Sequence, residues 1–201
     1  MSGKSEITFA MGDRCNLKVV FDRPIEEAMC CCESKFIIGI ESGEQYEVAI
    51  SKHCIMGNMN ELEGKLERAL EGRLPYYPQD GLSLGYWLNR WAHDDLGNEG
   101  QDLNYYVLDY IVLEYGCRLT LFLYSQDGKF FWEISSKYPI MFSAKEDDEG
   151  NYPAFCEFMK SYKPHCIIST DRDTLRRMLA EVKLLIDMIL VNTDGKTRNE
   201  D

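Results

Sequence analysis

Two His-Cys pairs, His53-Cys54 and His165-Cys166, are the residues of this chain whose types could bind a metal. Zinc prefers imidazole nitrogen and thiolate sulfur, supplied by short motifs of regular spacing. The sequence has no C-x-x-C or H-x-x-x-H motif, and adjacent residues of an extended segment point to opposite faces. We therefore expect buried thiols beside partly exposed imidazoles, with no metal and no cofactor.

The run Cys30-Cys31-Cys32 is the second group with chemical potential. A disulfide needs a Cα separation and orientation that neighbouring residues reach only with strain, so we expect reduced thiols. Glu26, Glu27 and Glu33 surround the run, and nearby carboxylates disfavour the nucleophilic thiolate. A catalytic cysteine is therefore not expected, and reduced thiols indicate a reducing compartment.

A third group is acidic and follows His93, with Asp94, Asp95, Glu99 and Asp102 in close succession. Carboxylates at such spacing could coordinate a divalent cation or serve as a general base with its orienting partner. Acids in a segment between helices are usually exposed to water, so we keep a metal-dependent hydrolase using residues 93–102 as an alternative only.

No complete catalytic motif is present elsewhere. Gly195-Lys196-Thr197 matches the last residues of a phosphate-binding loop, but Leu190 stands where that loop requires a glycine, and the segment follows a helix instead of a strand. We therefore predict that the protein is not an enzyme.

The aromatic-acidic segment, residues 74–117, differs most from the rest of the chain. It contains nine aromatic residues, and seven acids against a single base, Arg90. Aromatic side chains dominate protein interfaces, and uncompensated acids steer a basic partner. The predicted partner-binding residues are Trp87, Trp91, Asp94, Asp95, Glu99, Asp102 and Asp109. The alternative is that the aromatic residues belong to the core while the acids face water.

The elements that must position these residues are hairpins and helices. Alternating apolar residues around short turns predict three hairpins, of which the last is the clearest. They comprise residues 7–12 with 16–22, 35–40 with 45–51, and 118–125 with 129–135. Residues 103–115 fit a buried strand or a buried helix, and their Tyr, Val and Ile content favours the strand.

Apolar residues at helical spacing predict four helices, and a short strand is expected over 166–169. The helices are expected from Asn60 to Gly72, over 82–93, from Pro153 to Lys163, and from Leu175 to Ile189. Hairpins interleaved with helices predict an α+β fold, in which an antiparallel sheet built from hairpins has helices packed on one face. A single domain over 1–191 is expected, with a possible subdomain boundary near 73–81 and a flexible tail over 192–201.

Net charge and hydropathy restrict the partners. The chain has 34 acids against 22 Lys and Arg, a formal charge of −12, which is the reverse of a nucleic-acid-binding surface. Charges interrupt the first twenty residues, and the longest apolar runs are shorter than a membrane span. We expect a cytoplasmic protein without a membrane or direct nucleic-acid partner, and the sequence leaves its oligomeric state open.

Three short motifs of the C-terminal half carry a resemblance. Residues 121–135 read LFLYSQDGKFFWEIS, Tyr138-Pro139 follows them, and residues 160–164 read KSYKP. With these motifs the chain resembles small bacterial proteins, some of which are similar to the immunity proteins of polymorphic-toxin systems. The resemblance implies a cytoplasmic binding protein that blocks a cognate toxin by covering its active surface.

These observations lead to one hypothesis and a second alternative. The hypothesis is a non-enzymatic inhibitor of a basic toxin, such as a nuclease, that binds through the acidic aromatic surface. The second alternative is a phage or mobile-element anti-defence protein that binds a host effector, or that sequesters a small nucleotide through Arg172, Arg176, Arg177 and Lys183.

Overall fold

The computed structural model describes residues 5–47, 55–73, 83–93, 106–111, 118–126, 128–138 and 155–197. It divides into two compact units, each with its own four-stranded sheet. Unit 1 comprises Met1–Arg73 and Thr170–Asp201, and unit 2 comprises Leu74–Ser169. The chain passes from unit 1 to unit 2 between Arg73 and Leu74. This point lies at the start of the 73–81 segment, for which the sequence predicts a possible subdomain boundary. Along the chain, unit 2 is thus inserted into unit 1.

The sheet of unit 1 consists of two successive hairpins in the order β1-β2-β3-β4. Its strands are β1 (Glu6–Gly12), β2 (Cys15–Phe21), β3 (Ser34–Ile40) and β4 (Gln45–Glu47). All neighbours are antiparallel, and Phe9, Leu17 and Ile38 lie opposite one another across three strands. These three side chains are fully buried, because the period-two alternation directs them all to one face.

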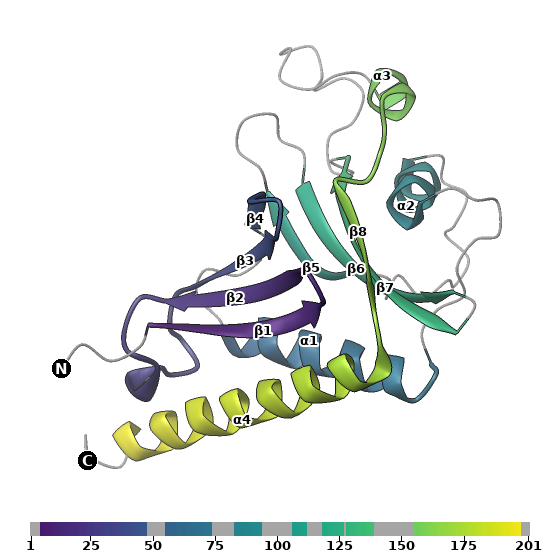
Figure 1. The fold of residues 1–201 in the computed structure, drawn as a ribbon. Helices are drawn as coiled ribbons and strands as arrows, with labels where there is room; N and C mark the ends of the chain where they lie inside the picture. The colour runs from purple at the N-terminus through teal and green to yellow at the C-terminus, as the bar shows by residue number, and fades with distance from the viewer. Residues whose placement is uncertain are drawn as a thin grey trace, which may run out of the picture. The chain divides into compact units, whose positions relative to one another are not determined.

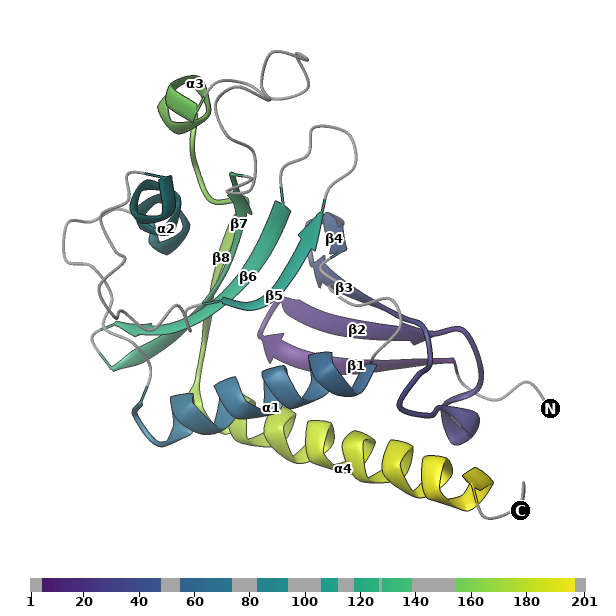
Figure 2. The same cartoon turned by 180° about the vertical axis from the view of Figure 1, so that it is seen from behind.

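Helices α1 (Ile55–Leu70) and α4 (Arg172–Thr197) lie side by side in unit 1, and α4 also packs against β1 (Figures 1 and 2). The buried residues of α1 include Ile55, Met59, Leu62 and Leu66, which recur every three or four positions. Because Ile55 and Met59 extend this stripe, α1 begins before Asn60, where the sequence analysis placed its start. A short 3-10 helix, η1 (Ile25–Glu27), also contacts α4.

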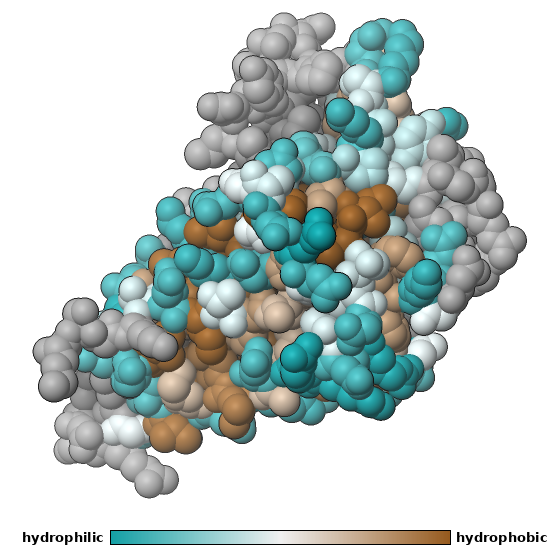
Figure 3. Space-filling model, in the orientation of Figure 1, coloured by the Kyte–Doolittle hydropathy of each residue, from teal (hydrophilic) through white to brown (hydrophobic). Residues whose placement is uncertain are grey.

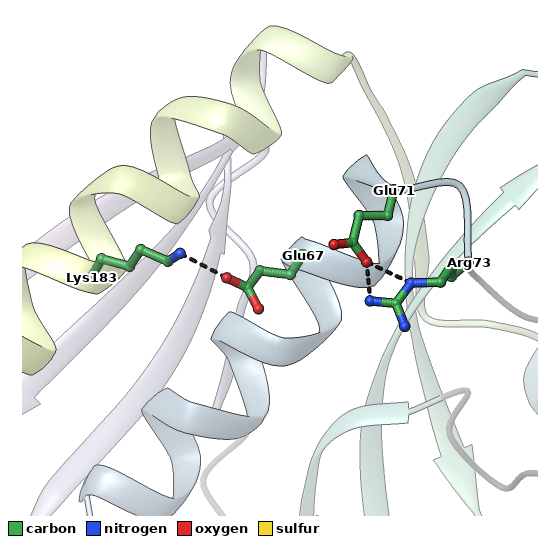
Figure 4. A network of polar contacts seen from close by, with 4 residues as sticks. All are labelled: Glu67, Glu71, Arg73 and Lys183. Carbon is green, nitrogen blue, oxygen red and sulfur yellow. Dashed lines mark hydrogen bonds and ion pairs between the residues drawn. The ribbon is translucent and has the colours of Figure 1, made fainter.

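Charged residues connect α1 to α4. The Lys183 ammonium lies 2.7 Å from the Glu67 carboxylate and 3.7 Å from that of Glu63 (Figure 4). These contacts raise the pKa of Lys183, chiefly through the hydrogen bond to Glu67. At the end of α1, Arg73 pairs with Glu71. Both pairs are partly exposed to water, so they fix orientation more than they add stability.

The C-terminal residues correct one prediction. Helix α4 continues to Thr197, so residues 192–197 are helical and not a flexible tail. Polar contacts hold this last part of the helix. Asn192 donates hydrogen bonds to the carbonyl oxygens of Ala28 (3.0 Å) and Ile25 (3.4 Å). The hydroxyl of Thr193 accepts one from the amide of Cys30 (3.1 Å). An apolar periodicity cannot reveal such contacts.

Unit 2 contains a sheet of order β5-β6-β7-β8 and two helices. The strands are β5 (Tyr106–Ile111), β6 (Arg118–Gln126), β7 (Lys129–Lys137) and β8 (Cys166–Thr170), and the helices are α2 (Leu84–His93) and α3 (Phe155–Lys160). Strands β5, β6 and β7 pair antiparallel. The strand interpretation of residues 103–115 is confirmed for 106–111. The clearest predicted hairpin is also confirmed as β6–β7, with Gly128 at φ 76° in its turn.

The α+β class and the antiparallel hairpins are therefore confirmed, although two sheets take the place of one. The first predicted hairpin is β1–β2, and the second is β3–β4 up to Glu47, with the remainder outside the described residues. Within the described ranges, no helix is long and apolar enough to cross a membrane.

Candidate binding surface on helix α2

The seven predicted partner-binding residues fall into three groups. Trp87 and Trp91 lie on α2, four positions apart and so on one side of the helix. Asp109 lies on β5 opposite Thr120 of β6. The other four, Asp94, Asp95, Glu99 and Asp102, are outside the described residues. Helix α2, which packs on β6 and β7, therefore carries two of the three predicted residues that the structure describes, and β5 carries the third.

An apolar cluster forms the base of α2. Leu84 and Leu88 are buried against Phe122 and Tyr124 of β6, and Trp87 packs at the edge of this cluster with part of its surface exposed. The aromatic rings of Tyr124 and Phe131 stack beside it with centroids 5.6 Å apart. Trp87 is therefore partly buried against the core cluster and partly exposed, and its role in partner binding stays a prediction.

A buried carboxylate fixes the N-terminus of α2. Glu133 of β7 is 0% exposed, and its Oε2 and Oε1 accept hydrogen bonds from the amides of Leu84 (3.1 Å) and Gly85 (2.8 Å). The amide of Tyr86 donates to the hydroxyl of Ser83 (3.2 Å). The free amides of the first helical turn thus have acceptors, and a carboxylate lies at the positive end of the helix dipole.

Ser135 completes the environment of Glu133 by donating a hydrogen bond of 2.6 Å to Oε1. Burial raises the pKa of Glu133, while the hydrogen bonds from Ser135, Gly85 and Leu84 oppose the rise. Both carboxylate oxygens are used to hold the helix, so the geometry gives Glu133 a positioning role.

Asn89 forms a second polar contact between α2 and β7. Its Nδ2 donates to the carbonyl oxygens of Gly85 (2.8 Å) and Ser136 (2.9 Å), and its Oδ1 accepts from the amide of Tyr138 (2.6 Å). The side chain is 3% exposed. Two polar contacts and one apolar cluster therefore hold α2 in a defined orientation on the sheet.

Gly85 permits this close packing. A Cβ atom at position 85 would overlap the hydroxyl of Tyr162 and would lie 2.6 Å from the Cβ of Ser135. Tyr162 packs edge-on against Tyr86, with ring centroids 5.8 Å apart, and against Phe158 of α3 at 5.5 Å. Burial raises the pKa of the Tyr162 hydroxyl, which keeps it neutral.

Sequence reasoning missed the Glu133 and Asn89 contacts. The available signal was Glu133, the single acid of the apolar strand 129–137. It lies two residues after Phe131 and two before Ser135. Period two places these three residues on one face of the sheet, where an isolated carboxylate needs hydrogen-bond donors. The sequence does not show which amides supply them.

Among the residues that the structure describes, the other chemical groups of the sequence analysis do not form a metal site. Within the described ranges, no group of three His, Cys, Asp or Glu side chains could hold a metal ion. Of the cysteine run, Cys31 is exposed and Cys32 is buried. His165 is exposed and lies 2.8 Å from the Ser136 hydroxyl, whereas His53-Cys54 is outside the described residues.

Two basic residues of α4, Arg176 and Lys183, have acidic partners. Arg176 pairs with Asp173 at 3.0 Å, and Lys183 with Glu67. Arg177 donates to the hydroxyl of Thr174 at 3.2 Å. The positive charges of Arg176 and Lys183 are therefore partly neutralised within unit 1.

A scan against models of protein families finds no match to the chain, and a search of curated proteins finds no relative.

Proposed function

We propose that the protein is a non-enzymatic binding protein of the cytoplasm that inhibits a basic partner protein, such as a nuclease toxin. The contact surface comprises the outer side of α2 and the acidic segment 94–102 that follows it. The observation that carries the proposal is Trp87, a partly exposed indole on a helix held by Glu133 and Asn89. A preorganised aromatic residue loses little conformational entropy on binding, which is typical of interface hot spots.

Charge supports the same partner class. The formal charge of −12 attracts a basic protein, and Asp94, Asp95, Glu99 and Asp102 follow α2 in the sequence. Acidic inhibitors of nucleases present the kind of charge that their target binds in its substrate. Association should therefore slow steeply as salt screens the charges.

The first test uses the polypeptide encoded by the neighbouring upstream gene as the probe. We expect it to inhibit growth when expressed alone, and co-expression of the present chain to restore growth. Binding of the two purified proteins should show an association rate that falls steeply between low and high salt. The absence of binding, or a rate that does not change with salt, would contradict the proposal.

The second test locates the surface. Trp87→Ala should weaken binding by at least about tenfold, as expected for a hot-spot residue. The triple reversal Asp94→Lys, Asp95→Lys, Glu99→Lys should slow association more than a control of equal charge change, Glu26→Lys, Glu27→Lys, Glu44→Lys, whose residues are exposed on unit 1. Equal effects of the two triple variants would rule out this location.

No specific observation favours the other candidates. Nucleotide sequestration would require a concentrated positive charge on α4, and the ion pairs of Arg176 and Lys183 reduce it. The acids proposed for metal-dependent hydrolysis, Asp94, Asp95, Glu99 and Asp102, all lie outside the described residues.

A further inference from the structure

A cavity of about 440 Å³ lies beside the β1–β2 and β3–β4 turns of unit 1, away from helix α2. Its lining comes from these turns and from the ends of the strands that they connect, and a volume of this size holds a small organic group. Hydrophilic residues cover much of the described surface in Figure 3, with hydrophobic patches between them. Hydropathy therefore does not set the cavity apart, and its ligand is defined by hydrogen-bonding groups and charges.

Three residues in line across the sheet form the base of the cavity. Asn16 of β2 pairs with Gly39 of β3, and Gly39 pairs with Gln45 of β4. They share the face of the sheet opposite to that of the buried Leu17 and Ile38. The Asn16 side chain leans over the glycine, because a Cβ atom at position 39 would lie 3.1 Å from its Oδ1. Within the described ranges, neither amide side chain has a hydrogen-bond partner.

The charged residues of the lining differ in whether they have a partner. Arg14 pairs with Glu41 at 3.1 Å, and Lys18 pairs with Glu6 of β1 at 3.4 Å. Asp13, in the β1–β2 turn, is exposed, and no ion pair or side-chain hydrogen bond involves it among the residues that the structure describes. The cavity therefore offers one free carboxylate and two free amides to a ligand.

These groups favour a flat cation. A guanidinium carries five N–H donors in one plane, and it can donate two parallel hydrogen bonds to a carboxylate and others to amide oxygens. Neighbouring strands lie about 4.8 Å apart, so the Cα atoms of Asn16 and Gln45 are about 10 Å apart, with no side chain on the glycine between them. A flat group fits this gap better than a compact, strongly hydrated ammonium does. An anion would be repelled by Asp13 and by the formal charge of −12.

We propose that this cavity binds a guanidinium group, whose N–H donors reach Asp13 and the amide oxygens of Asn16 and Gln45. The group belongs either to a free guanidino compound or to an arginine side chain of a polypeptide. The inference does not depend on the proposed inhibitor function, because that function is assigned to α2 of unit 2 and the segment after it.

The first test is a titration of the ¹⁵N-labelled full chain, followed by NMR, with free L-arginine and with N-acetyl-L-arginine amide as probes. We expect saturable shifts of the side-chain amide signals of Asn16 and Gln45, with a dissociation constant on the order of 1 mM. The tighter of the two probes identifies the source of the group. N-acetyl-L-lysine amide should bind at least about fivefold more weakly. Unsaturated shifts up to about 50 mM of both arginine probes, or equal binding of the lysine probe, would overturn the proposal.

Two variants then locate the site. Asp13→Asn should raise the dissociation constant at least about tenfold, because it removes the charge from the hydrogen bonds to the carboxylate. Gly39→Val should abolish binding by filling the gap between the amides, and circular dichroism checks that the sheet remains folded. The control is Asp187→Asn, which makes the same change of charge at an exposed position of α4. Equal affinities of Asp13→Asn and Asp187→Asn, or unchanged binding by a folded Gly39→Val, would rule out this cavity.

Discussion

Glu133 orients α2 through two hydrogen bonds. Each of its carboxylate oxygens accepts one backbone amide, that of Leu84 or that of Gly85. Ser135 adds a third donor. A buried group with unmet hydrogen-bonding capacity is costly, so each member of this network depends on the others. The identity of residue 133 therefore affects both stability and the presentation of Trp87.

The variant Glu133→Gln tests this dependence. We expect it to lower the free energy of unfolding by about 1–3 kcal/mol, because the amide nitrogen of glutamine would face a backbone N–H donor and leave it without an acceptor. Chemical denaturation measured by circular dichroism gives the value. Lys129→Gln, in an exposed position at the start of β7, is the matched control and should change little.

The titration of Glu133 gives a second prediction. Its pKa in the folded chain lies above the ordinary value of 4.5, so the folded state binds this proton more tightly than the unfolded state. Its contribution to the free energy of unfolding should therefore fall as pH rises from about 4.5 through the raised pKa. The difference between wild type and Glu133→Gln, measured across this window, should decrease with rising pH. A difference that increases would contradict the assignment.

Asp171 has a lowered pKa in the folded chain, so its effect on stability changes with pH in the opposite direction to that of Glu133. Its Oδ1 accepts the amide of Thr174 at 2.7 Å at the start of α4, and this bond holds the pKa of Asp171 below its ordinary value. The stabilisation is present above the ordinary carboxyl pKa and is lost as pH falls through the lowered one.

We expect Asp171→Ala to lower the melting temperature by about 3–8 °C at neutral pH, as loss of a helix cap does, and by less in acid. Thermal melts followed at 222 nm would measure both values. Asp173→Ala, an exposed acid in the first turn of α4, is the control. An equal effect of the two variants would argue against a specific cap.

At the scale of elements, the sequence was informative where local patterns determine structure. Alternation around Gly128 predicted the β6–β7 hairpin, and helical spacing predicted α2 between 82 and 93. Contacts between distant residues could not be predicted in the same way. The α4 extension depends on Asn192 reaching Ala28, and the position of α2 depends on Glu133, nearly fifty residues away.

The candidate surface was predictable only in part for the same reason. The composition of residues 74–117 identified an aromatic and acidic segment, and α2 holds Trp87 partly exposed at the edge of an apolar cluster. How much of the Trp87 side chain is buried depends on its packing against Leu84, Phe122 and Tyr124, which come together only in the folded unit. Sequence periodicity alone could not assign it.

At the scale of the whole molecule, unit 1 is built from the two ends of the chain and unit 2 from its middle. A chain that ends at Ser169 would retain every residue of unit 2 and lose α4. We expect limited proteolysis of this truncated chain to leave a protected fragment from unit 2 while residues 1–73 are degraded. In the full-length chain both units should resist cleavage. Protection of residues 1–73 in the truncated chain would show that α4 is not required for the fold of unit 1.

The late position of α4 also has a consequence for synthesis on the ribosome. Strands β1 to β4 precede unit 2 in the chain, whereas α4, the helix that packs on β1, is translated only after unit 2. Until it emerges, β1 lacks the contacts with α4 that the finished unit provides. The nascent chain therefore passes through a stage in which the middle of the protein can fold while its beginning remains exposed to aggregation or to chaperones.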